Sequence, residues 1–143
     1  MFEVIPYKHE HIAPLLEQKI NLPIKAFFTT GPGSQFESRG TAFTGTYDGV
    51  PVICGAIEHI WENRGIIWSV FNEECKGNFV PVFRAIKKFL SQSEYKRIEV
   101  SIPCDFLIGR RRAEMLGFKL ECECAKKYLP DGTDCAIYAM VKE

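Results

Sequence analysis

Runs in which apolar and polar residues alternate recur along the chain and are typical of strands with one buried face. They predict strands at residues 2–5, 41–47, 50–60, 66–71, 97–102, 118–128 and 134–141. Pro6 ends the first run, which places that strand at or near a sheet edge. Asp48-Gly49 tolerates positive φ and predicts a tight hairpin turn. Asn63-Arg64-Gly65 predicts a turn before the fourth strand, and Pro130-Asp131-Gly132 predicts a hairpin between the last two strands.

Apolar residues at steps of three and four positions predict helices between these strands. The helices are expected at residues 8–20, 79–90 and 106–116. Asn78 is the expected N-cap of the second helix, and Gly117 ends the third. Residues 22–39 predict a short helix or turn and then a loop suited to lining a substrate cleft. Because the second helix stands between two strands, a right-handed crossover makes 66–71 and 97–102 parallel, and the sheet is mixed.

Length and composition predict a single domain over residues 1–143, since 46% hydrophobic residues are enough for one buried core. Lysine plus arginine number 18 and aspartate plus glutamate number 18, so no overall charge attracts nucleic acid or an anionic membrane. No run approaches the roughly 20 apolar residues of a membrane span. Glu3 stands where a secretory signal carries basic residues, so we expect a cytoplasmic protein.

The six cysteines include no C-x-x-C pair, so their spacing predicts no metal site. Cys122 and Cys124 would share one face of a strand. The chain has enough core to fold without disulfides, and we expect reduced, buried or half-buried thiols.

Two short motifs accompany this order of elements: Met115-Leu116-Gly117-Phe118 after the last predicted helix, and Tyr138-Ala139-Met140 in the last strand. With them the chain resembles the GNAT acyl-CoA N-acyltransferase superfamily along nearly its whole length, including acetyltransferase-like proteins of tailed bacteriophages. The resemblance implies an α/β (α+β) fold with a mixed, centrally splayed, six- or seven-stranded sheet flanked by helices. It also implies that acyl-CoA enters between strands 66–71 and 97–102, without a metal ion.

The resemblance places the family's phosphate loop, Q/R-x-x-G-x-G/A, at residues 74–79. Backbone N–H groups at such a helix start bind phosphate. Glu74 replaces the usual opening residue, and a bulky phenylalanine stands where the pattern has a small residue. An altered cofactor site or an ordinary capped helix is therefore the alternative. The implied cofactor-binding residues of this loop are Lys76, Gly77, Asn78 and Phe79.

Three further residues complete the implied cofactor site. Val70 and Phe71 would offer backbone N–H groups at the splayed strand edge, where they can stabilise an oxyanion. Arg110 would reach a CoA phosphate. The side chains of the basic cluster Arg110-Arg111-Arg112 fan around a helix and cannot all bind one anion, so a solvated face is expected for the cluster as a whole.

The family's usual catalytic residues are missing. Ala113 stands where many members have a tyrosine that protonates the departing thiolate, and Phe106 stands where many have asparagine. Tyr128 would replace that acid if the last hairpin folds back. For each candidate the alternative is an ordinary surface residue. The candidates for a general base are Glu58, His59 and Glu73.

The sequence therefore predicts an acyl-CoA-dependent N-acetyltransferase that transfers an acetyl group from acetyl-CoA to an amine, with no nucleic-acid or membrane partner. The alternative is a catalytically inactive GNAT-fold module with a binding or structural role, of phage type.

Overall fold

The computed structural model describes residues 1–29, 42–74 and 79–143. The strands in these residues form a seven-stranded mixed sheet in the order β1-β2-β3-β4-β5-β7-β6. The chain packs as two compact units, and β3 and β4 contribute residues to both. Unit 1 comprises Met1–Ile57 and Ser69–Gln92, and unit 2 comprises Glu58–Trp68 and Ser93–Glu143. A single domain over residues 1–143 stays a prediction.

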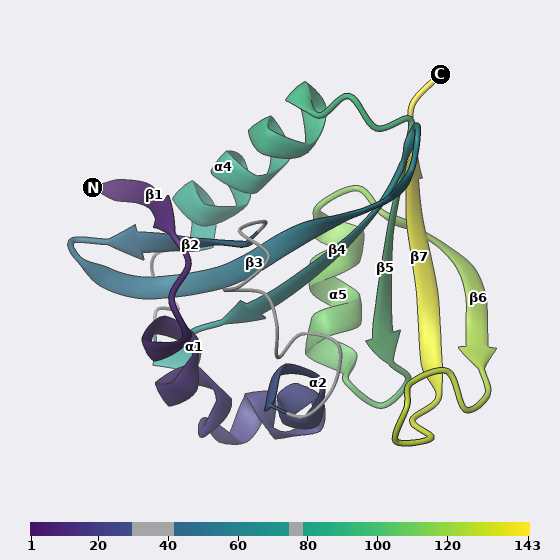
Figure 1. Ribbon diagram of the computed structural model, residues 1–143, viewed down its shortest axis with the longest axis horizontal. Helices are drawn as coiled ribbons and strands as arrows, with labels where there is room; N and C mark the ends of the chain where they lie inside the picture. The colour runs from purple at the N-terminus through teal and green to yellow at the C-terminus, as the bar shows by residue number, and fades with distance from the viewer. Residues whose placement is uncertain (30–41, 75–78) are drawn as a thin grey trace. The chain divides into compact units, whose positions relative to one another are not determined.

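Figure 1 shows the elements in chain order. They are β1 (Phe2–Pro6), α1 (His9–Leu16), a 3₁₀ helix (Lys19–Ile24), α2 (Lys25–Thr29), β2 (Ala42–Tyr47), β3 (Val50–Trp61), β4 (Arg64–Phe71), α4 (Phe79–Gln92), β5 (Arg97–Pro103), α5 (Leu107–Met115), β6 (Lys119–Ala125) and β7 (Cys135–Val141). The predicted α/β class and mixed sheet are confirmed. None of the helices in the described ranges is long and apolar enough to span a lipid bilayer.

In unit 1, β1 pairs antiparallel with β2, and β2 pairs antiparallel with β3. The predicted hairpin turn is confirmed, because Asp48 and Gly49 both have positive φ, 51° and 84°. The turn before β4 was predicted one residue too late. Asn63 has the positive φ, 69°, and β4 already begins at Arg64.

The first helix is shorter than the predicted 8–20. Helix α1 ends at Leu16, and a 3₁₀ helix follows from Lys19. The carbonyl oxygen of Leu15 accepts hydrogen bonds from the Gln18 N–H (3.2 Å) and from Asn21 Nδ2 (2.9 Å). The buried Asn21 side chain thus takes the place of the next helical N–H donor, and the α-helix stops.

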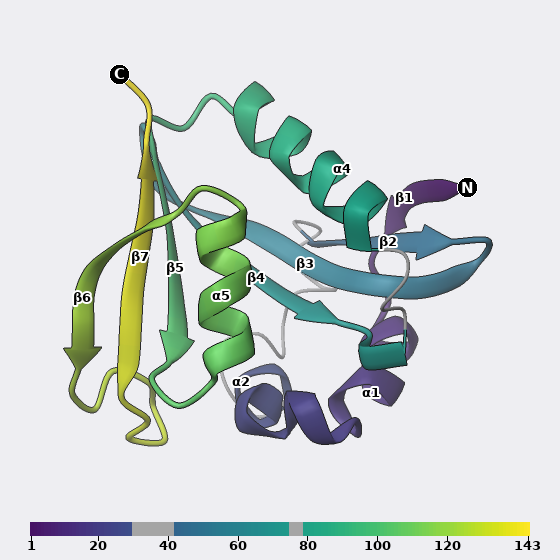
Figure 2. The same ribbon diagram turned by 180° about the vertical axis from the view of Figure 1, so that it is seen from behind.

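In unit 2, β4 pairs parallel with β5, as predicted, and β5 and β6 both pair antiparallel with β7. Helix α5 packs against β5 and β6 (Figure 2). The predicted strand 118–128 was too long, since β6 ends at Ala125. Lys127 has a positive φ of 50°, and its N–H donates to Asp134 Oδ1 at 2.8 Å, which turns the chain away from the sheet.

Gly117 ends α5 in a Schellman motif, which gives the Leu-Gly-Phe signature a physical reason. The N–H of Gly117 donates to Glu114 O, and the N–H of Phe118 donates to Ala113 O, each at 3.0 Å. Gly117 has a φ of +99°, a conformation that strains other residues. Phe118, the next residue, is buried in the core.

Gly117→Ala is expected to lower the free energy of unfolding by about 1–2 kcal/mol. The cost comes from the backbone, because the new methyl group would meet Met140 Cε at an ordinary 3.6 Å. Urea unfolding followed by circular dichroism measures it. Arg111→Ala, at an exposed position of the same helix, is the control and should change stability by less than about 0.5 kcal/mol. Equal stability of the two variants would contradict this explanation.

Candidate functional site

The parallel ladder between β4 and β5 is short. It joins Arg64–Ile66 to Arg97–Glu99 and ends there, although β4 continues to Phe71 and β5 to Pro103. Within unit 2 the two strands therefore part after Ile66 and Glu99, which agrees with the splayed sheet expected for this fold. Parted strands leave backbone groups that a ligand can use for hydrogen bonds.

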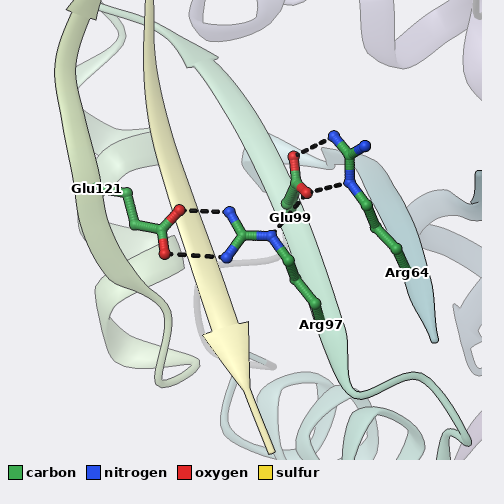
Figure 3. A network of polar contacts seen from close by, with 4 residues as sticks. All are labelled: Arg64, Arg97, Glu99 and Glu121. Atoms are coloured by element: carbon green, nitrogen blue, oxygen red, sulfur yellow. Dashed lines mark hydrogen bonds and ion pairs between the residues drawn. The ribbon is translucent and has the colours of Figure 1, made fainter.

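Four charged side chains form a row across β4, β5 and β6, at the end where β4 and β5 are paired (Figure 3). Arg64 binds Glu99 through both Nε and Nη2, the second contact measuring 3.0 Å. Arg97 Nε donates to the same carboxylate at 2.8 Å. Arg97 also grips Glu121 with two hydrogen bonds, one of 3.0 Å. We call Arg64, Glu99, Arg97 and Glu121 the clamp.

The clamp has a buried centre, since Glu99 is only 6% exposed. Hydrogen bonding to Arg64 and then to Arg97 lowers the pKa of Glu99, although its burial acts in the opposite direction. Arg97 likewise lowers the pKa of Glu121. A buried carboxylate held by two guanidinium groups is well compensated, so the charges pin the strands together at the last paired residue.

Ser101 follows the clamp on β5, beyond the end of the ladder. Its hydroxyl oxygen is buried and has no hydrogen-bond partner among the described residues. Ser101 shares a face with Glu99 because side chains alternate along a strand. The opposite face packs on α5, where a Cβ added at Gly109 would lie 3.2 Å from Ile102 Cγ2. An unpartnered buried hydroxyl is a free donor and acceptor for a ligand.

In unit 1, three side-chain amides hold the end of β4, where Val70 and Phe71 are buried. Asn21 Nδ2 donates to Phe71 O at 2.8 Å. Gln18 Nε2 donates to Asn72 Oδ1 at 2.9 Å. Gln18 Oε1 accepts the next backbone N–H, that of Glu73, at 2.8 Å. The strand end and the turn after it are therefore fixed by side chains from the segment that follows α1.

An aromatic cluster occupies the start of α4. The rings of Phe71, Phe79 and Phe83 contact one another in all three pairs, with centroids 5.8–5.9 Å apart. Phe79, which stands where the GNAT pattern has a small residue, is thus half-buried in unit 1. The other three residues of the implied phosphate loop, Lys76, Gly77 and Asn78, lie outside the described residues, as do residues 30–39 of the expected substrate loop.

The structure places the four catalytic candidates as follows. Glu58 is half-buried on β3 in unit 2, and Glu73 is half-buried directly after β4 in unit 1. Tyr128 lies in the β6–β7 connection and is 44% exposed. Partial burial and then the charge of Glu99 raise the pKa of the Tyr128 phenol. The tyrosine therefore lies within electrostatic reach of the clamp. His59 is exposed, with Nδ1 at 3.0 Å from the Tyr95 hydroxyl.

Arg110 has three protein partners. Its Nε donates to the Tyr138 hydroxyl at 3.0 Å, Nη1 to Cys104 O at 3.3 Å and Nη2 to Glu123 at 2.9 Å. Binding a CoA phosphate would require some of these bonds to break. The solvated face expected for the arginine triplet is wrong for Arg112, which is 7% exposed and whose pKa burial lowers to about 10.

Solved acetyltransferase structures superpose on nearly the whole chain. An N-acetyltransferase from Staphylococcus aureus Mu50 matches with a TM-score of 0.72 and 14% identity, over 99% of this chain and 97% of its own. A GNAT-family acetyltransferase from Bacillus anthracis matches with a TM-score of 0.67 and 15% identity, over 98% and 94%. The chain has the GNAT fold.

A third match is a ribosomal L7/L12 α-N-protein acetyltransferase solved in complex with coenzyme A, with a TM-score of 0.64 and 14% identity over 99% of this chain and 94% of its own. No protein-family model matches the sequence, and no curated protein matches it. At these identities the likeness to the GNAT structures lies in the fold.

Sequence reasoning missed the clamp of this GNAT fold and the amides around the end of β4. The signal for the clamp is the one charged residue, Glu99, inside the strand Ile98–Ile102. Such a carboxylate must find a cation when the strand is buried. The sequence does not show which arginine forms the ion pair with Glu99, because Arg64 lies 35 positions away.

Glu99→Gln is expected to lower the free energy of unfolding at pH 7 by about 2 kcal/mol, because the charged hydrogen bonds to Arg64 and Arg97 weaken at a buried position. The pKa of Glu99 is lowered in the folded state. The contribution of the Glu99 charge to the free energy of unfolding is therefore complete above the ordinary glutamate pKa of about 4.3. It is lost as the pH falls through the lower pKa that Glu99 has in the folded state. The stability gap between wild type and variant should shrink below pH 4.

Urea unfolding at pH 7 and at pH 3.5 measures both effects. Glu94→Gln, at an exposed position just before β5, is the matched control and should be as stable as the wild type at either pH. If the difference in free energy of unfolding between wild type and Glu99→Gln stays constant with pH, the carboxylate charge is not what stabilises the paired end of β4 and β5.

Proposed function

We propose that this chain is an acyl-CoA-dependent N-acetyltransferase that transfers the acetyl group of acetyl-CoA to an amine in the cytoplasm, with residues 1–143 acting as one domain. The parting of β4 and β5 after Ile66 and Glu99 carries the proposal, because it leaves strand edges able to bond the amides of a pantetheine chain. Buried Ser101 lies beyond that point and supports it, because its hydroxyl has no hydrogen-bond partner in residues 1–29, 42–74 and 79–143. The GNAT fold supports the reaction class, since the solved acetyltransferases with this fold cover nearly the whole chain.

In this proposal acetyl-CoA is a substrate bound by the chain's own backbone. The N–H groups of Val70 and Phe71 stabilise the oxyanion that forms when the amine attacks the thioester carbon. Lys76, Gly77, Asn78 and Phe79 hold the phosphates at the start of α4, and Arg110 adds a charge if it leaves Glu123. Holding both reactants in one orientation supplies much of the rate acceleration.

Two proton transfers complete the reaction. Glu73 or Glu58 takes the amine proton, directly or through water. Tyr128 gives a proton to the departing CoA thiolate, replacing the tyrosine that is absent at Ala113. A tyrosine phenol is protonated at neutral pH and can therefore act as the donor, and the raised pKa of Tyr128 makes it a weaker acid than a free phenol.

The aromatic cluster favours a second candidate, a catalytically inactive GNAT-fold module with a binding or structural role. Phe71, Phe79 and Phe83 fill space at the start of α4 with apolar rings. Apolar rings give a phosphate no hydrogen-bond donor, so a chain that kept the fold for another purpose would tolerate them.

Titration calorimetry with acetyl-CoA separates these two functions. The transferase is expected to bind one equivalent with a Kd between about 1 µM and 1 mM. Gly77→Glu should weaken binding at least about 10-fold through repulsion of the phosphates. Lys87→Glu, at an exposed position of α4, is the charge-changing control and should bind like the wild type. No saturable heat from the wild type would favour the inactive module.

Tyr128→Phe is expected to lower kcat about 100-fold, with little change in KM for acetyl-CoA, because it removes the proton donor and leaves the ring. Release of free CoA thiol, with whichever amine gives turnover in a screen, measures the rate. Tyr47→Phe, on β2, is the matched control and should keep the wild-type rate. An unchanged kcat in Tyr128→Phe would remove the tyrosine from the mechanism.

A further inference from the structure

Two half-buried cysteines of unit 2 lie in direct contact. Cys104 follows the end of β5, and Cys124 lies in β6, 20 positions further along the chain. The thiol of Cys104 donates to Cys124 Sγ, with the two sulfur atoms 3.3 Å apart. Neither is in a disulfide. Both side chains remain partly exposed, so a small reagent can reach the pair.

Two other cysteines of the described residues differ from this pair because they are fully buried. Cys54 and Cys135 are 1% and 0% exposed, and burial raises the pKa of each thiol to about 12. A buried thiol that stays protonated is a poor nucleophile. In the described part of the chain, no group of three or more His, Cys, Asp or Glu residues is arranged to hold a metal ion. The contact pair is therefore better suited to sulfur chemistry than to metal binding.

The surroundings give the two sulfur atoms different roles. Lys126 lies beside Cys124, and a negative charge on that sulfur is the largest influence raising the pKa of the lysine. A positive charge beside a cysteine stabilises the negative charge that its sulfur carries when it attacks a disulfide. Loss of hydration and the hydrogen bond to Cys124 raise the pKa of Cys104, so its sulfur keeps the proton. Asp134 contacts Lys126 at 3.4 Å, and its negative charge also raises the pKa of Cys104.

We propose that Cys104 and Cys124 form a redox-active dithiol that reacts with small disulfides, such as glutathione disulfide, and closes into an intramolecular disulfide. The Cys124 thiolate attacks one sulfur of the small disulfide, whose S–S bond breaks, and one glutathione thiolate leaves. Cys104 then loses its proton and attacks Cys124 Sγ, releasing the second glutathione. The protein is oxidised by two electrons, and one glutathione disulfide is reduced to two glutathione thiols.

The geometry requires little movement. A disulfide bond needs the sulfur atoms to approach by about 1.3 Å from their present contact. Cys104 is anchored by its N–H, which donates to Asp134 O at 3.0 Å at the start of β7. The closed loop would contain all of α5, so the bond restricts the unfolded chain and stabilises the folded one. This inference does not rest on the proposed acetyltransferase activity.

The test treats the full reduced chain with glutathione disulfide at pH 8. We expect two of the six thiols to disappear, a product lighter by two hydrogens, and a tryptic peptide pair joined through Cys104 and Cys124. Tm should rise by about 10 °C on oxidation and return to its original value on reduction. A protein that keeps all six thiols, or ends only as a glutathione adduct, would overturn the proposal.

Variants assign the roles of the two sulfurs. Cys104→Ser is expected to stop at the glutathione adduct on Cys124, whereas Cys122→Ser, the matched control on the same strand, should form the disulfide as the wild type does. Lys126→Met should slow the first step several-fold, and Lys119→Met, an exposed control on β6, should not. A crosslink between Cys122 and Cys124 in the wild type would contradict the assignment, and peptide mapping detects it without any variant.

Discussion

The bidentate ion pair between Arg64 and Glu99 is the constraint on which the rest of this structure depends. It joins Arg64, the first paired residue of β4, to Glu99, the last paired residue of β5, and Arg97 and Glu121 extend it across unit 2. Parallel strands with a complete ladder would leave no edge for a ligand. Without the clamp, little would keep Arg64–Ile66 paired with Arg97–Glu99. The ion pair thus sets where the sheet is closed and where it opens.

Three polar residues at and after the end of the ladder on β5 differ in their hydrogen-bond partners. Glu99 is held by two arginines, the Ser101 hydroxyl has no hydrogen-bond partner within the described part of the chain, and Cys104, the residue after the strand, contacts a second thiol. The polar residues of one strand therefore lead from a fixed anchor to groups that are free to react or bind. In unit 1, the side chain of Asn21 fixes the end of β4, so that strand end is also preorganised.

Local patterns in the sequence were enough for the strands, the Asp48-Gly49 turn, the parallel crossover and the helix end at Gly117, because each depends on residues close together in the chain. The end of α1 was misplaced because a side-chain hydrogen bond from Asn21 to Leu15 O ends the helix, which hydrophobic periodicity does not show. The clamp was missed because its pairs between different strands join residues 24 and 35 positions apart. Charge and burial at single positions show that a partner is needed, but the fold decides which residue provides it.

Amide hydrogen exchange measured residue by residue, with and without acetyl-CoA, tests the central claim most directly. If the edge of β4 beyond Ile66 receives the substrate, backbone amides within Ile67–Phe71 should exchange more slowly when acetyl-CoA is present, while those of the clamped ladder at Arg64–Ile66 should stay as they are. Unchanged exchange along Ile67–Phe71 at saturating acetyl-CoA would contradict the account, because the opened strand edge would then have no part in binding.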